Sequence, residues 1–225
     1  MSTGLETELV KLNPLTREHT IYKIGRERLP SVTALIALSN LDSKYQRLMG
    51  WQLKTVRAGL DPTAVSGDAA TVGTLVHAMA EAHLTGTEVD YQFFSADQRR
   101  IADIAFTTFL GWLKENKIEP IAVEKPLTHL TYRYGGTIDI WARSGKRYLL
   151  CDLKSSTAVF LDHRIQLAAY SQLVTHRYKK PHDCIILHLS KETGQLTIHP
   201  FSDLKAEWEV FRTCLKLHDL QKRLK

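Results

Sequence analysis

Residues 135–170 read GGTIDIWARSGKRYLLCDLKSSTAVFLDHRIQLAAY, and the interpretation of the whole 225-residue chain starts from them. Asp139 lies within one apolar run, and Asp152 and Lys154 lie at the end of the next. Carboxylates are costly to place inside apolar strands unless a positive charge or a metal compensates them. Two such acids, followed closely by a lysine, are therefore the main candidates for chemistry in this chain.

The composition is ordinary for a globular protein, with 44% hydrophobic and 24% charged residues. The length suits one large domain, or one domain with a helical insertion. No stretch approaches the roughly 20 apolar residues of a transmembrane helix, and the N-terminal MSTGLETELVKLNP does not resemble a secretory signal. The net charge of +6 is compatible with a polyanionic partner but is too small to indicate nucleic acid by itself.

The chain has three cysteines, Cys151, Cys184 and Cys214, which are widely spaced and flanked by apolar residues. None belongs to a C-x-x-C motif, so we expect reduced thiols in the core rather than a zinc or iron–sulfur site. The expected location is the cytoplasm, or the host cytoplasm if the source is viral.

Apolar periodicity divides the chain into a mainly helical N-terminal half and a C-terminal half with strands. In the N-terminal half we expect a hairpin or edge strand over residues 19–31, a helix capped by Ser31 or Thr33, helices over 42–60, 69–84 and 96–117, and a loop over 61–68. In the C-terminal half we expect strands over 118–130, 132–143, 146–154, 183–190 and 195–201, and helices over 162–179 and 203–225. This pattern predicts one α/β or α+β core with an N-terminal helical elaboration.

Alternate side chains of a strand share a face, so Asp152 and Lys154 are expected to point the same way. Asp139 is flanked by Ile138 and Ile140, which we expect to face away from it. If the two strands pair as an antiparallel hairpin, Asp139 and Asp152 approach each other. Two carboxylates and a backbone carbonyl form an oxygen-rich site that suits Mg²⁺ or Mn²⁺. A nearby lysine can help to activate water or stabilise charge on a phosphate, which together predicts phosphodiester hydrolysis.

The order of the motifs resembles that of the PD-(D/E)XK nuclease superfamily, and more narrowly its RecB-like branch of phage and mitochondrial genome maintenance exonucleases. The matching motifs are GTLVH at 73–77, Asp139 within GGTID, Asp152-Leu153-Lys154, Gln166-x-x-x-Tyr170, and LPSVT at 29–33. The resemblance runs from about Leu29 to Tyr170. It implies a restriction-endonuclease-like core, with a central mixed β-sheet of about five strands flanked by helices. Residues 1–225 would form a single nuclease domain, in which the helical region of residues 1–116 contributes a histidine and residues 117–225 form the catalytic sheet.

The resemblance also implies metal-binding and catalytic roles. His77, Asp139 and Asp152 would bind Mg²⁺ or Mn²⁺, with help from the backbone carbonyl of Leu153. Lys154 would be the catalytic lysine. Relatives with an iron–sulfur cluster carry four cysteines around the nuclease core, and this chain has no such set, so we expect no cluster.

Further residues would support the site from its surroundings. Gln166 and Tyr170, one helical turn apart, would hold the DNA backbone or brace the site. Arg164 would be an additional phosphate contact. Glu124 and Glu81 would lie just outside the set of metal ligands, Glu81 because it shares a helix face with the histidine.

Plainer interpretations stay open for each signal. A lone histidine on an apolar helix is usually a core residue, and Asp152 and Lys154 could form a simple ion pair. Gln166 and Tyr170 could be ordinary positions of an amphipathic helix. The order of the motifs favours the functional interpretation.

The expected function is a metal-dependent deoxyribonuclease, acting as an exonuclease on single-stranded DNA or DNA ends in replication, repair or recombination. Two alternatives remain: a structure-selective endonuclease, and a non-catalytic DNA-binding protein that retains a nuclease fold. The sequence has no GxxxxGK[ST] motif, so any unwinding would come from a separate partner such as a helicase, a polymerase or a single-strand-binding protein. We expect a monomer.

Overall fold

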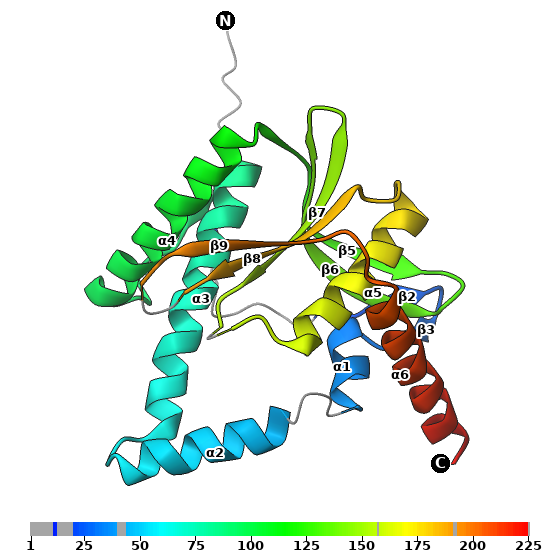
Figure 1. The fold of residues 1–225 in the computed structure, drawn as a ribbon, viewed down its shortest axis with the longest axis horizontal. Helices are drawn as coiled ribbons and strands as arrows, with labels where there is room; N and C mark the ends of the chain where they lie inside the picture. The colour runs from blue at the N-terminus through cyan, green and yellow to red at the C-terminus, as the bar shows by residue number, and fades with distance from the viewer. Residues whose placement is uncertain (1–10, 13–19, 40–43, 157, 191–192, 225) are drawn as a thin grey trace, which may run out of the picture.

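A mixed five-stranded sheet forms the centre of the protein in the computed structural model, which describes residues 11–12, 20–39, 44–156, 158–190 and 193–224 (Figure 1). The strands are β5 (Ile118–His129), β6 (Tyr134–Ser144), β7 (Arg147–Lys154), β8 (Asp183–Leu189) and β9 (Leu196–Phe201), and they lie in this order. Neighbouring strands are antiparallel except β7 and β8, which are parallel. The predicted mixed sheet of about five strands is confirmed.

Helices cover both faces of this sheet, namely α1 (Val32–Ala37), α3 (Pro62–Thr85), α4 (Ala96–Glu115), α5 (Leu161–Arg177) and α6 (Lys205–Arg223). Helix α2 (Lys44–Arg57) lies apart from the sheet and contacts α3 (Figure 1). One hydrophobic core joins α1, α5 and α6 to the sheet, and a second core joins α3 and α4 to the opposite face (Figure 1). Helix α5 connects β7 to β8. These two strands are parallel, so they need a long crossover connection, whereas a short hairpin turn can join only antiparallel strands.

Short elements complete the N-terminal region. β1 (Lys11–Leu12) pairs with β4 (Glu88–Val89), and β2 (Lys23–Ile24) pairs with β3 (Glu27–Arg28) as the expected hairpin. Ser31 caps α1, because its Oγ atom accepts a hydrogen bond from the backbone N–H of Ala34 at 3.1 Å. No helix in the described portion of the chain has the length and hydropathy needed to cross a bilayer.

Helix α3 is longer than the sequence pattern predicts, and the expected loop over 61–68 is wrong. The helix begins at Pro62, directly after Asp61, whose carboxylate accepts a hydrogen bond from the backbone N–H of Thr63 at 2.9 Å. A capping aspartate followed by proline is a strong helix start, and it outweighs the turn-forming composition that follows. Gly86 ends the helix with φ of +73°, as its position suggests.

Strand β6 changes faces at Asp139. Ile138 packs into the core formed with α1, α5 and α6, whereas Ile140 packs into the core formed with α3 and α4. The expectation that both isoleucines face away from Asp139 is therefore wrong, because the two pack on opposite faces of the sheet. The backbone is also irregular on the neighbouring strand: opposite Asp139, Glu124 of β5 has φ of +44°, a region that residues other than glycine adopt infrequently.

The three cysteines are buried free thiols, in agreement with their prediction as core residues. Burial raises the pKa of the Cys151 and Cys184 thiols above the ordinary range, in the latter case to about 11. Both thiols therefore remain protonated at neutral pH and behave as small apolar side chains.

Candidate active site

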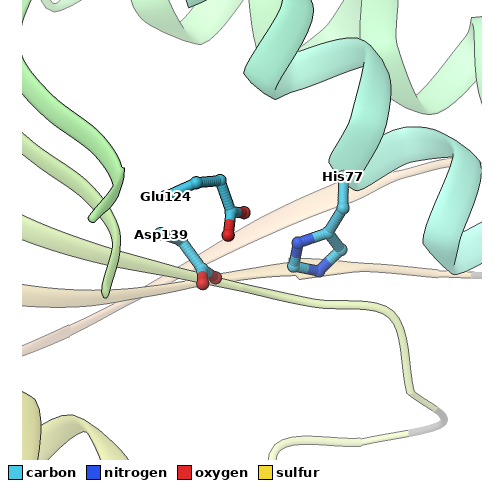
Figure 2. A group of neighbouring side chains, drawn as sticks. All are labelled: His77, Glu124 and Asp139. Atoms are coloured by element: carbon cyan, nitrogen blue, oxygen red, sulfur yellow. The ribbon is translucent and has the colours of Figure 1, made fainter. Parts of the chain in front are cut away.

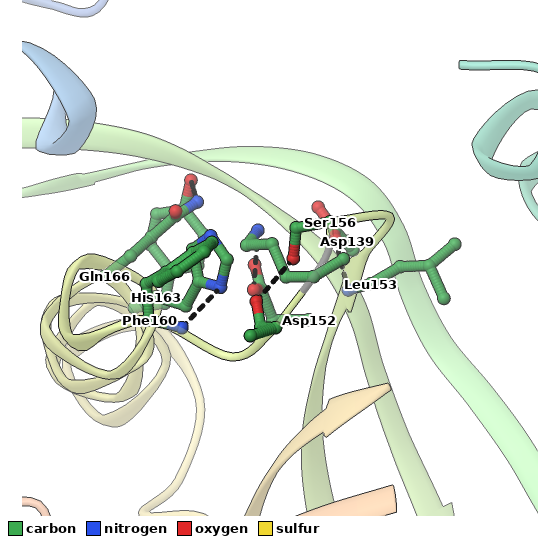
Figure 3. Close-up of polar contacts among 10 residues, drawn as sticks. Asp139, Asp152, Leu153, Ser156, Phe160, His163 and Gln166 are labelled. Atoms are coloured by element: carbon green, nitrogen blue, oxygen red, sulfur yellow. Dashed lines mark hydrogen bonds and ion pairs between the residues drawn. The ribbon is translucent and has the colours of Figure 1, made fainter. Parts of the chain in front are cut away.

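Three neighbouring strands bring carboxylates to one place near the end of β7. The strand register places Glu124 of β5 opposite Asp139 of β6, and it places Asp139 opposite Asp152 of β7, because the neighbouring residues of these strands pair with one another. The carboxylate of Asp139 is fixed by the backbone N–H of Leu153, which donates a hydrogen bond to its Oδ2 atom at 2.7 Å (Figure 3). Metal binding by the Leu153 carbonyl stays a prediction.

A histidine reaches these acids from helix α3, which packs with α4 on one face of the sheet. His77 extends from α3 toward Glu124 and Asp139 (Figure 2), and one ligand atom from each of the three residues lies within 4.8 Å of the others. All three side chains are partly accessible to solvent. We call this set the histidine–carboxylate cluster. It brings the predicted ligands His77 and Asp139 together, and it includes Glu124, which the sequence placed just outside the ligand set.

Asp152 and Lys154 form a buried ion pair beside this cluster. The Nζ atom of Lys154 lies 2.6 Å from Oδ2 of Asp152 (Figure 3), and the Asp152 side chain is fully buried. Its Oδ1 atom has no hydrogen-bond partner among the described residues. Burial raises the pKa of Asp152 to about 6, and the charge of Asp139 adds to the increase, whereas Lys154 and His77 act in the opposite direction. An unsatisfied buried oxygen next to other carboxylates is suited to a cation.

Lys154 is held in its charged form. Burial by itself lowers the pKa of a lysine, but the carboxylates of Asp152 and Asp139 outweigh it and raise the pKa of Lys154 above its ordinary value. The side chain is only 16% exposed. It therefore offers an ammonium group in a largely dry environment, where its field is screened less than on the surface.

Gln166 and Tyr170 of α5 contact each other beside the site. The Nε2 atom of Gln166 donates a hydrogen bond to the Tyr170 hydroxyl at 2.8 Å. Burial and the charges of Asp152 and Asp139 raise the pKa of Tyr170 well above its ordinary value, so its hydroxyl stays protonated. The Tyr170 ring packs on Gly136, where an added Cβ would lie 2.6 Å from ring atom Cε1. Both predicted roles, bracing of the site and contact with the DNA backbone, stay predictions.

Arg164 and Glu81 lie around the site in different settings. Arg164 forms an ion pair with Glu207 of α6, which is buried, and its guanidinium lies 5.4 Å from the centre of the Phe201 ring. These contacts tie α5 to α6, a role that the sequence did not predict, and a phosphate contact by Arg164 stays a prediction.

Glu81 is partly buried one turn beyond His77 on α3, beside a hollow that Glu124 also lines.

The position of His77 depends on a close contact between α3 and the segment after β7. A Cβ atom added to Gly73, one turn before His77, would lie 1.9 Å from Oγ and 2.7 Å from Cβ of Ser155. Ser155 directly follows Lys154 in the chain. The glycine therefore lets the helix approach the strand end closely enough for the histidine to reach the acids.

We expect Gly73→Ala to destabilise the protein and to reduce its activity. Alanine is favoured over glycine inside a helix by about 1 kcal/mol, but overpacking costs about 1–3 kcal/mol. The cost of the clash should therefore exceed the gain in helix propensity, and the free energy of unfolding should fall. Thermal unfolding and a cleavage assay measure the two effects, and Ser155→Gly in the same chain should restore both. Gly111→Ala in α4 is the matched control, because the added Cβ would meet no atom within 4 Å. A Gly73→Ala variant as stable and active as the wild type would contradict this packing argument.

The fold and the site together define the class of the protein. A mixed sheet carries paired acids and a lysine near the end of its central strand β7, next to a histidine from α3. The sequence model of the PD-(D/E)XK nuclease superfamily matches residues 48–221, which is most of the chain, and the chain belongs to this superfamily. No curated protein matches it significantly.

Solved structures with a similar fold include two exonucleases. A putative exonuclease from Eubacterium rectale has a TM-score of 0.48 and 13% identity, over 67% of this chain and 65% of that one. The alkaline exonuclease LHK-Exo from Laribacter hongkongensis, in complex with dAMP, has a TM-score of 0.39 and 14% identity, over 69% of this chain and 86% of that one. Similarity at this level carries no functional argument.

Proposed function

We propose that this protein is a metal-dependent deoxyribonuclease that acts as an exonuclease on single-stranded DNA or DNA ends, in replication, repair or recombination. The observation that carries the proposal is the position of the histidine–carboxylate cluster directly beside the Asp152–Lys154 ion pair. Superfamily membership supports phosphodiester hydrolysis, and the RecB-like motifs support exonuclease action.

The donor set fits Mg²⁺ or Mn²⁺. Carboxylate oxygens are the preferred ligands of both ions, and an imidazole nitrogen favours Mn²⁺ over Mg²⁺. The cluster would hold the ion, and the unsatisfied Oδ1 atom of Asp152 would supply a further oxygen. When bound, such an ion polarises the phosphate and activates water for attack.

The chain's own groups would position and stabilise the reacting phosphate. The Leu153 N–H donates a hydrogen bond to Oδ2 of Asp139 and thereby fixes the orientation of this carboxylate. Lys154 carries an ammonium group, and its raised pKa means that it does not readily act as a base. It is better suited to stabilise the negative charge that develops on the phosphate. Of the two roles open to a lysine in such a site, water activation and charge stabilisation, the second is therefore favoured.

The proposal is tested by incubating the protein with end-labelled single-stranded DNA and Mg²⁺ or Mn²⁺, with and without EDTA. We expect stepwise shortening of the DNA that requires the metal, and no cleavage of closed circular single-stranded DNA. Cleavage that persists in EDTA would contradict metal dependence. Linearised circles would indicate the endonuclease, and salt-sensitive binding without cleavage in any metal would indicate the non-catalytic protein. An RNA strand of the same sequence tests the preference for DNA.

We further propose that residues 1–225 act as a single nuclease domain and a monomer in the cytoplasm. A helicase, a polymerase or a single-strand-binding protein would then supply single-stranded DNA. Size-exclusion chromatography with light scattering tests the monomer.

A further inference from the structure

A hollow of about 730 Å³ lies next to the candidate active site. Residues of the β2–β3 hairpin and of the segment that leads into α1 form one section of its wall, and residues of β5 and β6 form another. Glu124 of the histidine–carboxylate cluster lines it, and so does Glu81, one turn beyond His77 on α3. The hollow is therefore continuous with the place where a phosphate would react.

Besides its two acids, the wall combines three kinds of chemistry. Arg28 supplies a positive charge, and its side chain is exposed without an ion pair to any other described residue. Thr33 and Thr137 supply hydroxyl groups, which can donate and accept hydrogen bonds. Ile21, which is 53% exposed, and Pro30 supply apolar surface. A cation, hydroxyls and apolar surface together match the phosphate, the sugar and the base of a nucleotide.

This wall is held firmly against the sheet. The backbone N–H of Gly135 donates a hydrogen bond to the Pro30 carbonyl at 3.0 Å, and the hydroxyls of Tyr22 and Thr137 are 2.9 Å apart. The Tyr22 side chain packs directly on Gly135, where an added Cβ would meet it at 2.2 Å. A wall that is formed before the ligand arrives reduces the entropy cost of binding.

We propose that this hollow binds the nucleotide of a single strand that adjoins the reacting phosphate, and that Arg28 contacts a phosphate of its backbone. The inference rests on the proposed function and adds a substrate subsite to it. A volume of about 730 Å³ falls within the range of pockets that enclose small ligands, so it is large enough for a nucleotide or two. A nucleotide of a single strand can enter such a hollow directly, whereas a nucleotide of a duplex would first have to leave its base pair and its stack.

Binding measured without cleavage tests the subsite. Fluorescence anisotropy with a labelled 12-nucleotide oligo(dT) in EDTA gives the Kd for the wild type and for Arg28→Ala. We expect Arg28→Ala to weaken binding about tenfold, and to reduce the slope of log Kd against log salt by about 0.7, the value for one phosphate contact on a single strand. For a 12-base-pair duplex the same substitution should change the Kd less than twofold.

The matched control is Arg26→Ala. Arg26 is an exposed cation in the turn of the same hairpin and does not line the hollow, so its loss should change the Kd and the slope little. Arg28→Lys keeps the charge and should retain some of the affinity, and thermal unfolding verifies that each variant is folded. Wild-type affinity in Arg28→Ala, or an equal loss in Arg26→Ala, would overturn the subsite.

The outcomes for the subsite and for the proposed function are separable. If the protein cleaves DNA with Mn²⁺ but Arg28→Ala binds oligo(dT) normally, the nuclease stands and the subsite fails. If no metal supports cleavage but the loss of affinity is specific to Arg28, the hollow stands as a binding site for single-stranded DNA and the nuclease fails.

Discussion

Asp139→Asn is expected to reduce DNA cleavage by about 10³-fold or more, because it removes one of the charges that would hold a divalent cation. Asparagine keeps an oxygen that can accept the Leu153 N–H, so the fold should survive, whereas alanine would leave this backbone donor unsatisfied at a cost of about 1–3 kcal/mol. Single-turnover cleavage with saturating Mn²⁺ measures the effect.

Thermal unfolding gives a second measurement that does not depend on activity. Metal at 100 times its Kd stabilises a native protein by about 2.7 kcal/mol, so Mn²⁺ should raise the Tm of the wild type but not of Asp139→Asn. Without metal, the stability of the variant should stay close to that of the wild type, because the Asp139 charge acts unfavourably on Asp152 but favourably on Lys154.

Asp183→Asn is the matched control for this substitution. Asp183 begins β8 and pairs with Arg147, with 2.6 Å between Oδ1 and Nη2 and the arginine largely exposed. Surface pairs of this kind contribute at most about 1 kcal/mol, so cleavage and the Mn²⁺ shift should persist. Wild-type cleavage by Asp139→Asn would refute the proposed role of the cluster.

Lys154→Met is expected to reduce turnover by about 10²- to 10⁴-fold while leaving DNA affinity within about twofold. The lysine is only 16% exposed, so it contributes little to the surface that binds the DNA backbone. Its ammonium would instead act on charge that develops during the reaction, and the loss of such an interaction lowers kcat more than it weakens binding. Rapid-quench kinetics and anisotropy separate the two quantities.

The same substitution should destabilise the protein in a pH-dependent way. Removing one partner of a buried ion pair costs about 3–5 kcal/mol. Burial already raises the pKa of Asp152 to about 6, and without Lys154 the pKa should rise further. The native state then takes up a proton more readily than the unfolded chain, so stability falls as the pH rises. The Tm deficit of Lys154→Met should therefore be larger at pH 8 than at pH 5.

A double variant distinguishes this electrostatic cost from a loss of packing. Asp152→Asn combined with Lys154→Met leaves no buried charge at the pair, so it should recover stability and lose the pH dependence without recovering cleavage. Lys146→Met, in the exposed turn between β6 and β7, is the matched control and should behave as the wild type. Normal turnover in Lys154→Met would exclude a catalytic role for this lysine.

Much of the fold and some of the site followed from local sequence patterns. Periodicity of two predicted the strands, and it placed Asp152 and Lys154 on one face, where the structure shows them as an ion pair. The helix start at Pro62 was missed, although Asp61 and Pro62 carry the signal for it. The sequence places Glu124 just outside the ligand set, because periodicity does not give the strand register that sets Glu124 opposite Asp139.

The sequence by itself determined the order of the elements and the residues that carry charge within apolar strands, since both depend on neighbours a few positions away. Only the tertiary structure decided which of these residues meet. His77 reaches the acids because Gly73 admits Ser155 against α3, and the hollow with Arg28 exists because Tyr22 packs on Gly135. Contacts of this kind join segments far apart in the chain, and periodicity, which is a local property, does not encode their register or distance.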